Sequence, residues 1–143
     1  MGENSAIAWT DNTFSPWEGC EKVSPGCKHC YAEERNERFN GGKHWGPDSP
    51  RLLRSPAHWN KPKRWNREAA AAGKRTRVFC SSVSDVFEYR CDLVGERARL
   101  FSLVAETPAM DWLLLTKRPE NIDAMLPQSF RQWNRHDDGP APH

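Results

Sequence analysis

The sequence predicts an α/β protein with parallel strands, and three observations support this fold class. Short β-rich segments alternate with amphipathic helices along the chain. Residues 112–115 form a continuous apolar run, which is typical of a strand buried on both faces. Polar residues follow the predicted strands directly, at the ends where the working residues of parallel sheets gather. Because strands separated by helices pair in parallel through right-handed crossovers, these segments predict one thin open sheet.

The first half of the chain predicts a strand, a long loop and two helices. Asp11 breaks the strand, and apolar and aromatic residues then recur at the spacing of a helix. Pro62 suits the first turn of the second helix, with Asn60 as its cap and Gly73 at its end. The predicted elements are a strand over 5–10, a loop over 11–26, a helix over 28–39, irregular chain over 40–58 and a helix over 62–72.

The second half predicts two strands, each followed by polar residues, and two helices. Asp92 is expected to cap the longer helix, Pro108 to end it, and Pro119 to open the shorter one. The predicted elements are a strand over 77–81, a loop over 82–88, a helix over 93–106, a strand over 111–116 and a helix over 119–126. We therefore expect one domain over 1–126, followed by a polar, turn-rich tail over 127–143 that we predict to be disordered.

The composition excludes several classes of protein. The net charge is only +2, and no apolar run approaches the length of a membrane span. The amino terminus lacks the basic and apolar segments of a secretory signal, so a cytoplasmic protein is expected. The chain has 5 cysteines, an odd number that a fully paired disulfide framework does not give. In a reducing cytosol, clustered cysteines favour metal or redox roles.

Three of the cysteines, Cys20, Cys27 and Cys30, lie within eleven residues of one another. Six residues separate the first two, and two residues separate the last two. Three thiolates can hold three irons of a [4Fe-4S] cluster and leave the fourth iron open to a small ligand, such as S-adenosylmethionine. The predicted helix begins beside Cys27, and the positive end of a helix favours thiolates. This loop therefore predicts an iron–sulfur cluster.

Three other interpretations of the cysteine loop stay open. A zinc site would use the Cys-x₂-Cys pair and Cys20, and would take its fourth ligand from His29, His44 or Cys80. The same pair at a helix start also resembles a dithiol redox site, which leaves Cys20 unexplained. Cysteines also pack as small buried hydrophobes, although a loop rich in Gly, Pro, Ser and charge is a poor place for that.

Several separate motifs occur together, in order, over about residues 7–125. They are Ile7-Ala8-Trp9-Thr10, Trp17-Glu18-Gly19-Cys20, Ser24-Pro25-Gly26-Cys27-x-x-Cys30-Tyr31-Ala32-Glu33, Pro62-x-x-Trp65-Asn66, Arg77-Val78-Phe79-Cys80-Ser81-Ser82-Val83-Ser84-Asp85-Val86-Phe87 and Leu114-Leu115-Thr116-Lys117-Arg118-Pro119-Glu120. On these motifs the chain resembles a phage and prophage three-cysteine protein family, formerly a domain of unknown function. That family is similar to radical S-adenosylmethionine enzymes.

The resemblance implies a fold, a cofactor and a set of ligands. The fold would be a partial (β/α) barrel, of which this chain looks like the amino-terminal portion only, truncated at its carboxyl end. The cluster ligands would be Cys20, Cys27 and Cys30. Asp85 stands where similar enzymes often hold the methionine amino group, so it is the candidate contact for S-adenosylmethionine.

The polar residues after the last two strands are predicted to bind the cofactor. Asp85 follows one strand, and Thr116, Lys117 and Arg118 follow the other. Both groups are expected on the sheet edge that carries the cysteine loop, because parallel strands end at one edge. The two cations suit a carboxylate or a phosphate group.

Residues 51–77 carry nine Lys and Arg side chains against one acid, with Trp59 and Trp65 among them. Basic residues interleaved with aromatic rings suit phosphate backbones and stacked bases, so this segment is a candidate nucleic-acid surface. The favoured hypothesis is an iron–sulfur protein similar to radical S-adenosylmethionine enzymes, with a substrate that the sequence does not identify. The alternative is a zinc-stabilised nucleic-acid-binding module without catalysis.

Overall fold

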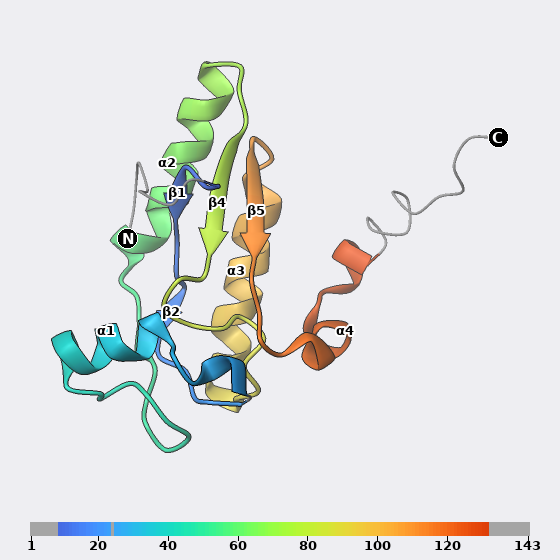
Figure 1. Ribbon diagram of the computed structural model, residues 1–143. Helices are drawn as coiled ribbons and strands as arrows, with labels where there is room; N and C mark the ends of the chain where they lie inside the picture. The colour runs from blue at the N-terminus through green and yellow to red at the C-terminus, as the bar shows by residue number, and fades with distance from the viewer. Residues whose placement is uncertain (1–8, 24, 132–143) are drawn as a thin grey trace.

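A parallel three-stranded sheet forms the centre of the molecule. The computed structural model describes residues 9–23 and 25–131 (Figure 1). The strands lie in the order β1-β4-β5, with bounds Asn12–Thr13, Thr76–Cys80 and Met110–Leu114. The predicted α/β class and the predicted parallel pairing are therefore confirmed, whereas closure into a partial barrel stays a prediction.

Two long helices cover one face of this sheet (Figure 1). They are α2, Pro56–Ala71, and α3, Val94–Glu106. Alternate residues of the strands point toward them, since side chains of a strand alternate between the two faces. The resulting core consists of Phe14, Trp59, Trp65, Val78, Cys80, Val86, Phe87, Leu100, Phe101, Leu103 and Met110.

The first strand among the described residues begins after the predicted strand ends. Residues 5–8 of the predicted strand lie outside the described residues, and Trp9 and Thr10 are not in a strand. The strand is instead β1, and hydrogen bonds from Asp11 N to Arg77 O and from Phe14 N to Phe79 O extend its ladder. Asp11 does not break the pairing, because its carboxylate accepts the Arg77 N–H at 2.9 Å.

Helix α2 begins at Pro56, six residues before the predicted start at Pro62. Ser55 is its N-cap, and Pro56 occupies the first turn, where the missing N–H costs nothing. Pro62 lies inside the helix, although proline removes one helical hydrogen bond. The buried rings of Trp59 and Trp65 anchor the helix on both sides of it, so tertiary packing outweighs this local cost.

The segment 40–58, predicted as irregular, contains part of a second, smaller sheet. Strand β2, Trp17–Glu18, pairs antiparallel with β3, Leu52–Leu53. Helix α1, Tyr31–Asn40, follows the cysteine loop and begins three residues later than predicted. These elements lie at the end of the sheet toward which the arrowheads of β4 and β5 point (Figure 1).

The last strand is less buried than its apolar run predicts. Trp112, Leu113 and Leu114 are half-buried, because β5 is an edge strand and helices cover only one of its faces. Before it, the 3-10 turn Cys91–Leu93 precedes α3, and Asp92 pairs with Arg90 rather than capping the helix.

The helical segment predicted after Pro119 is confirmed as a 3-10 turn, Pro119–Asn121, and α4, Ile122–Met125. Packing continues beyond it, since the Phe130 ring contacts the Phe101 ring with centroids 5.4 Å apart. Most of the predicted tail 127–143 lies outside the described residues. Within residues 9–23 and 25–131, no helix has both the length and the apolar character needed to cross a membrane.

Candidate metal centre

The three clustered cysteines lie on the connection between β2 and α1. Cys20 follows β2, Cys27 ends the 3-10 turn Pro25–Cys27, and Cys30 is the N-cap residue of α1. Cys27 is buried, and the other two are half-buried. None of these three described cysteines is in a disulfide bond, and the side chain of Cys30 makes no capping hydrogen bond. The predicted position of the pair at a helix start is therefore right, but both cysteines precede the first helical turn.

Arg118 joins the cysteine loop to the ends of the other strands. Its Nη1 lies 3.2 Å from Cys20 Sγ and 3.1 Å from Asp85 Oδ2, and its Nη2 donates to Glu21 O at 3.2 Å. The residue is only 4% exposed. The structure thus brings together Cys20, Asp85 and Arg118, which come from three separate regions of the chain and which the sequence predicted at one edge.

The Asp85 carboxylate accepts hydrogen bonds from four donors. Oδ1 accepts from Thr116 Oγ1 at 2.7 Å and from Phe87 N at 3.0 Å. Oδ2 accepts from Lys117 N at 3.0 Å and from Arg118 Nη1 at 3.1 Å. A carboxylate offers about four acceptor positions, so this set uses its capacity. Asp85 therefore fixes the turn after β5 against the loop after β4.

Two other loops hold the backbone beside Cys20. Gly46 N, in the loop over residues 44–46, donates to Cys20 O at 2.8 Å. Gly19 N donates to Val83 O, in the loop after β4, at 3.0 Å. Gly19 has φ 120°, and a Cβ there would lie 2.1 Å from His44 O. Only glycine therefore fits where the cysteine loop meets the loop over residues 44–46. The sequence did not predict this contact, because nothing in the local pattern brings residues 44–46 to the cysteine loop.

A buried ion pair that the sequence did not predict holds the loop over residues 44–49. Arg51 forms an ion pair with Glu88, and their side chains are 0% and 1% exposed. Arg51 Nη1 also donates to the carbonyl groups of His44, Gly46 and Ser49. Buried charges need such complete sets of partners. No sequence signal distinguishes these two residues from the many other charged side chains of the chain.

Helix α1 is attached to β2 through Glu18, a buried carboxylate whose role the sequence did not predict. It accepts hydrogen bonds from Arg35, Asn36 and Asn40 of α1 and from Arg54 after β3. Glu18 lies in β2, two residues before Cys20, so these contacts connect the start of the cysteine loop to the helix that follows it. The loop is therefore anchored at both of its ends.

The surroundings of Cys20 do not activate it as a free nucleophile. Burial raises the pKa of the Cys20 thiol, and the neighbouring Arg118 charge opposes that rise. Reactive cysteines usually have a lowered pKa and an accessible sulfur. The N–H group of Arg118 instead offers the Cys20 sulfur a hydrogen-bond donor, which suits a thiolate that binds metal.

The three clustered thiols do not surround a single point in the described part of the chain. In residues 9–23 and 25–131, no three Cys, His, Asp or Glu side chains converge closely enough to hold one ion. A zinc ion needs four ligands around one point, whereas a [4Fe-4S] cluster binds each cysteine to a different iron. The cluster and zinc interpretations of this loop therefore both stay predictions.

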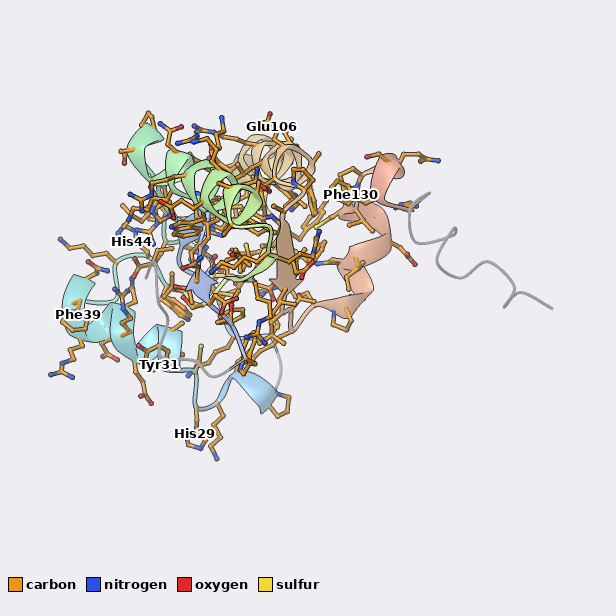
Figure 2. The ribbon with its side chains drawn as sticks, turned by 90° about the horizontal axis from the view of Figure 1, so that it is seen from above. His29, Tyr31, Phe39, His44, Glu106 and Phe130 are labelled. Carbon is orange, nitrogen blue, oxygen red and sulfur yellow. The ribbon has the colours of Figure 1, made fainter. Side chains whose placement is uncertain are left out.

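The three candidate fourth zinc ligands differ in their surroundings. Cys80 is fully buried in β4, and burial raises the pKa of its thiol far above the usual value. The His44 ring hydrogen-bonds Pro50 O at 2.9 Å. His29 is exposed and lies at the outer side of the loop (Figure 2). Cys80 is therefore a core residue, and zinc binding at the cysteine loop stays a prediction.

Both Trp rings and most of the cations of the basic segment 51–77 make contacts within the fold. Trp59 and Trp65 are each 3% exposed, so their rings are not available for stacking on bases. Six of its nine cations form ion pairs with acids in the described part of the chain: Arg51, Arg54, Lys63, Arg64, Arg75 and Arg77. Nucleic-acid binding by this segment stays a prediction from the sequence.

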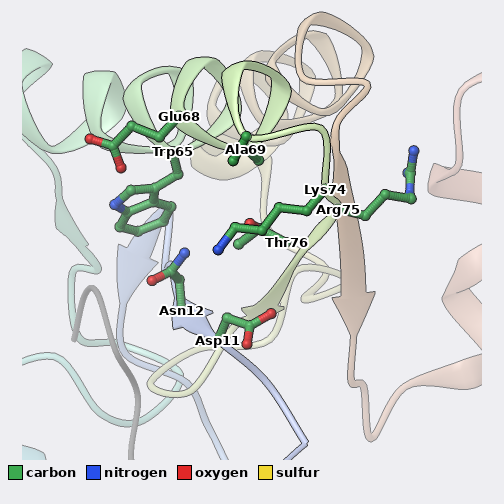
Figure 3. A pocket seen from close by; sticks show the side chains of 9 residues that line it. Asp11, Asn12, Trp65, Glu68, Ala69, Lys74, Arg75 and Thr76 are labelled. Carbon is green, nitrogen blue, oxygen red and sulfur yellow. The ribbon is translucent and has the colours of Figure 1, made fainter.

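A pocket lies at the opposite end of the sheet from the cysteine loop (Figure 3). It opens between the starts of β1 and β4 and the end of α2. Its lining consists of Asp11, Asn12, Trp65, Glu68, Ala69, Ala72, Lys74, Arg75 and Thr76. None of the predicted cluster or cofactor residues lines it, so it is separate from the candidate metal centre, although part of its lining belongs to the basic segment 51–77.

Comparison with known proteins identifies a family without a known activity. The family described as "Protein of unknown function (DUF5131)" matches residues 4–138. No curated protein and no solved structure matches the chain. The match supports the predicted resemblance to a domain of unknown function, and it does not test the similarity to radical enzymes.

Proposed function

We propose that this chain, which belongs to the DUF5131 family, holds an iron–sulfur cluster on Cys20, Cys27 and Cys30. One observation carries the proposal. The cysteine loop lies at the carboxyl edge of a parallel sheet, where Arg118 contacts both Cys20 Sγ and the Asp85 carboxylate. Open α/β sheets bind their ligands at this edge.

The chemistry that we propose is of the radical S-adenosylmethionine type. When such a cluster is bound with one iron left open, it supplies the electron that cleaves S-adenosylmethionine. The task of this chain is to hold the three thiolates, to orient the cofactor and to exclude water. Of these, the anchoring of the loop at Glu18 and at Gly46 supports the first task.

The polar residues at the sheet edge have different roles in this proposal. Asp85 and Thr116 position the turn after β5, because the Asp85 carboxylate is already satisfied by four donors. Lys117 is exposed at the rim of this edge, and we assign its ammonium group to an anionic part of the cofactor. Arg118 is buried against the cysteine loop, where it contacts Cys20 Sγ and Glu21 O.

The proposal is tested by reconstituting the protein with iron and sulfide without oxygen. We expect cluster absorption and, after reduction, a paramagnetic resonance signal that changes when S-adenosylmethionine is added. Replacing Cys20, Cys27 or Cys30 by Ser should each abolish the stable cluster. Cys91→Ser is the matched control, because Cys91 is exposed and lies outside the loop. Stoichiometric zinc without any cluster would contradict the proposal and favour the zinc-stabilised alternative.

A further inference from the structure

The geometry at Arg118 assigns each N–H group of one guanidinium nitrogen to a separate partner. Nη1 carries two N–H groups. It lies 3.1 Å from Asp85 Oδ2 and 3.2 Å from Cys20 Sγ, so the two partners account for both. Nη2 adds a hydrogen bond to Glu21 O, the carbonyl group that follows Cys20. A buried guanidinium group is therefore fixed against one sulfur of the cysteine loop.

We propose that Arg118 sets the reduction potential of the cluster that Cys20 would help to hold. This inference rests on the function proposed above. Hydrogen bonds to the sulfurs and nearby charge are two of the features that tune iron–sulfur potentials. A reduced cluster carries one more negative charge than an oxidised one, and a positive charge beside it stabilises the reduced form. Arg118 therefore raises the reduction potential.

Burial strengthens the effect of the Arg118 charge on the potential, and the neighbouring Asp85 charge opposes it. The side chains of Arg118 and Asp85 are 5% and 8% exposed, so water screens their charges weakly. Asp85 carries the opposite charge, and Arg118 Nη1 lies between its carboxylate and the sulfur. Asp85 is a positioning residue that aims the guanidinium group and also lowers the potential through its own charge. The two residues thus act on the cluster with opposite sign.

An arginine is suited to this position because its planar group holds several donors in fixed directions. A lysine would keep the charge, but its single ammonium group has no rigid fork to serve the sulfur, the carboxylate and the carbonyl group together. Arg118→Lys therefore separates the contribution of the charge from that of the oriented N–H group.

The test is the midpoint potential of the reconstituted cluster, followed by paramagnetic resonance during an anaerobic redox titration. For Arg118→Met we expect a tenfold fall in the reduction equilibrium constant, which corresponds to about 59 mV for a one-electron couple. Asp85→Asn should shift the potential upward. Arg75→Met is the matched control, because Arg75 also pairs with an aspartate but lies at the other end of the sheet, and it should leave the potential unchanged.

The outcomes separate this inference from the proposed function. If the unaltered chain forms no cluster, both fail. If it forms a cluster and Arg118→Met has the same potential, only the inference is overturned. Should Arg118→Met fail to fold, Arg118→Gln serves instead, because it also removes the charge, with an expected fall of at least threefold in the reduction equilibrium constant. An unchanged potential in Arg118→Gln would then overturn the inference.

Discussion

The two ends of the central sheet use the same pair of residue types in different surroundings. At the amino end, Arg75 donates to Asp111, and the side chains are 58% and 46% exposed. At the carboxyl end, Arg118 donates to Asp85, and the side chains are 5% and 8% exposed. The exposed pair exchanges easily with water, whereas the buried pair needs a complete set of partners. The buried pair is therefore held in one arrangement, in which the guanidinium group of Arg118 contacts Cys20 Sγ.

The largest expected effect at the carboxyl end comes from breaking the buried pair behind the cysteine loop. Arg51→Met leaves the Glu88 charge buried without its partner, and we expect a loss of about 3–5 kcal/mol in the free energy of unfolding. Urea unfolding measures it. The double variant Arg51→Met/Glu88→Leu should recover only part of the loss, because three carbonyl groups also lose their Arg51 donor. A loss near zero in the single variant would contradict a structural role for this pair.

A smaller effect is expected from the glycine between the two loops. Gly19→Ala places a Cβ 2.1 Å from His44 O at φ 120°, so the loops must separate. We expect a loss of about 1–3 kcal/mol in the free energy of unfolding. Gly73→Ala is the control, since its φ is also positive but no atom lies within 4 Å of the added Cβ. Equal losses in the two variants would show that only backbone strain, and not the close approach of the loops, matters at Gly19.

A pH-dependent effect is expected at His58, which lies in the first turn of α2 and stacks on Phe14, just after the carboxyl end of β1. Burial lowers its pKa to about 4, and its Nε2 hydrogen-bonds Ser15 O. The unfolded chain therefore binds a proton before the folded one does, and stability falls as the pH drops from about 6.5 toward 4. Because the side chain is only half-buried, we expect about 1 kcal/mol.

Urea unfolding at pH 7.5 and pH 5.0 measures this contribution. His58→Gln keeps a donor for Ser15 O and does not titrate, so its loss of stability between the two pH values should be smaller than that of the unaltered chain. The other titrating groups are the same in both proteins, and the comparison removes their contribution. An identical loss in both proteins would contradict the assignment to His58.

The smallest effect is expected at the amino end of the sheet. Arg75→Met breaks the exposed pair with Asp111, and we expect no measurable change in the urea midpoint at physiological salt, because such pairs contribute little. A clear loss of stability there would remove the contrast between the two ends of the sheet.

The sequence predicted those elements whose patterns are local. Strands β4 and β5, helix α3 and the turn after Pro119 lie within a few residues of the predicted bounds, because apolar runs, spacing and proline mark them. It misplaced β1 and the start of α2, where Phe14, Trp59 and Trp65 anchor the chain through contacts between distant residues. It missed the β2–β3 pair entirely, since strands of two residues carry no periodicity.

The sequence by itself determined which residues are candidate ligands and that they lie at the carboxyl edge of the sheet. Three clustered cysteines, and polar residues after two predicted strands, follow from residue type and from the rule that parallel strands end together. Only the tertiary structure decided which of them touch. Cys20 and Arg118 are 98 positions apart, and Asp85 and Arg118 are 33 apart. The carboxyl edge is organised by buried charges, whose partners depend on distance and burial, and no local pattern specifies either.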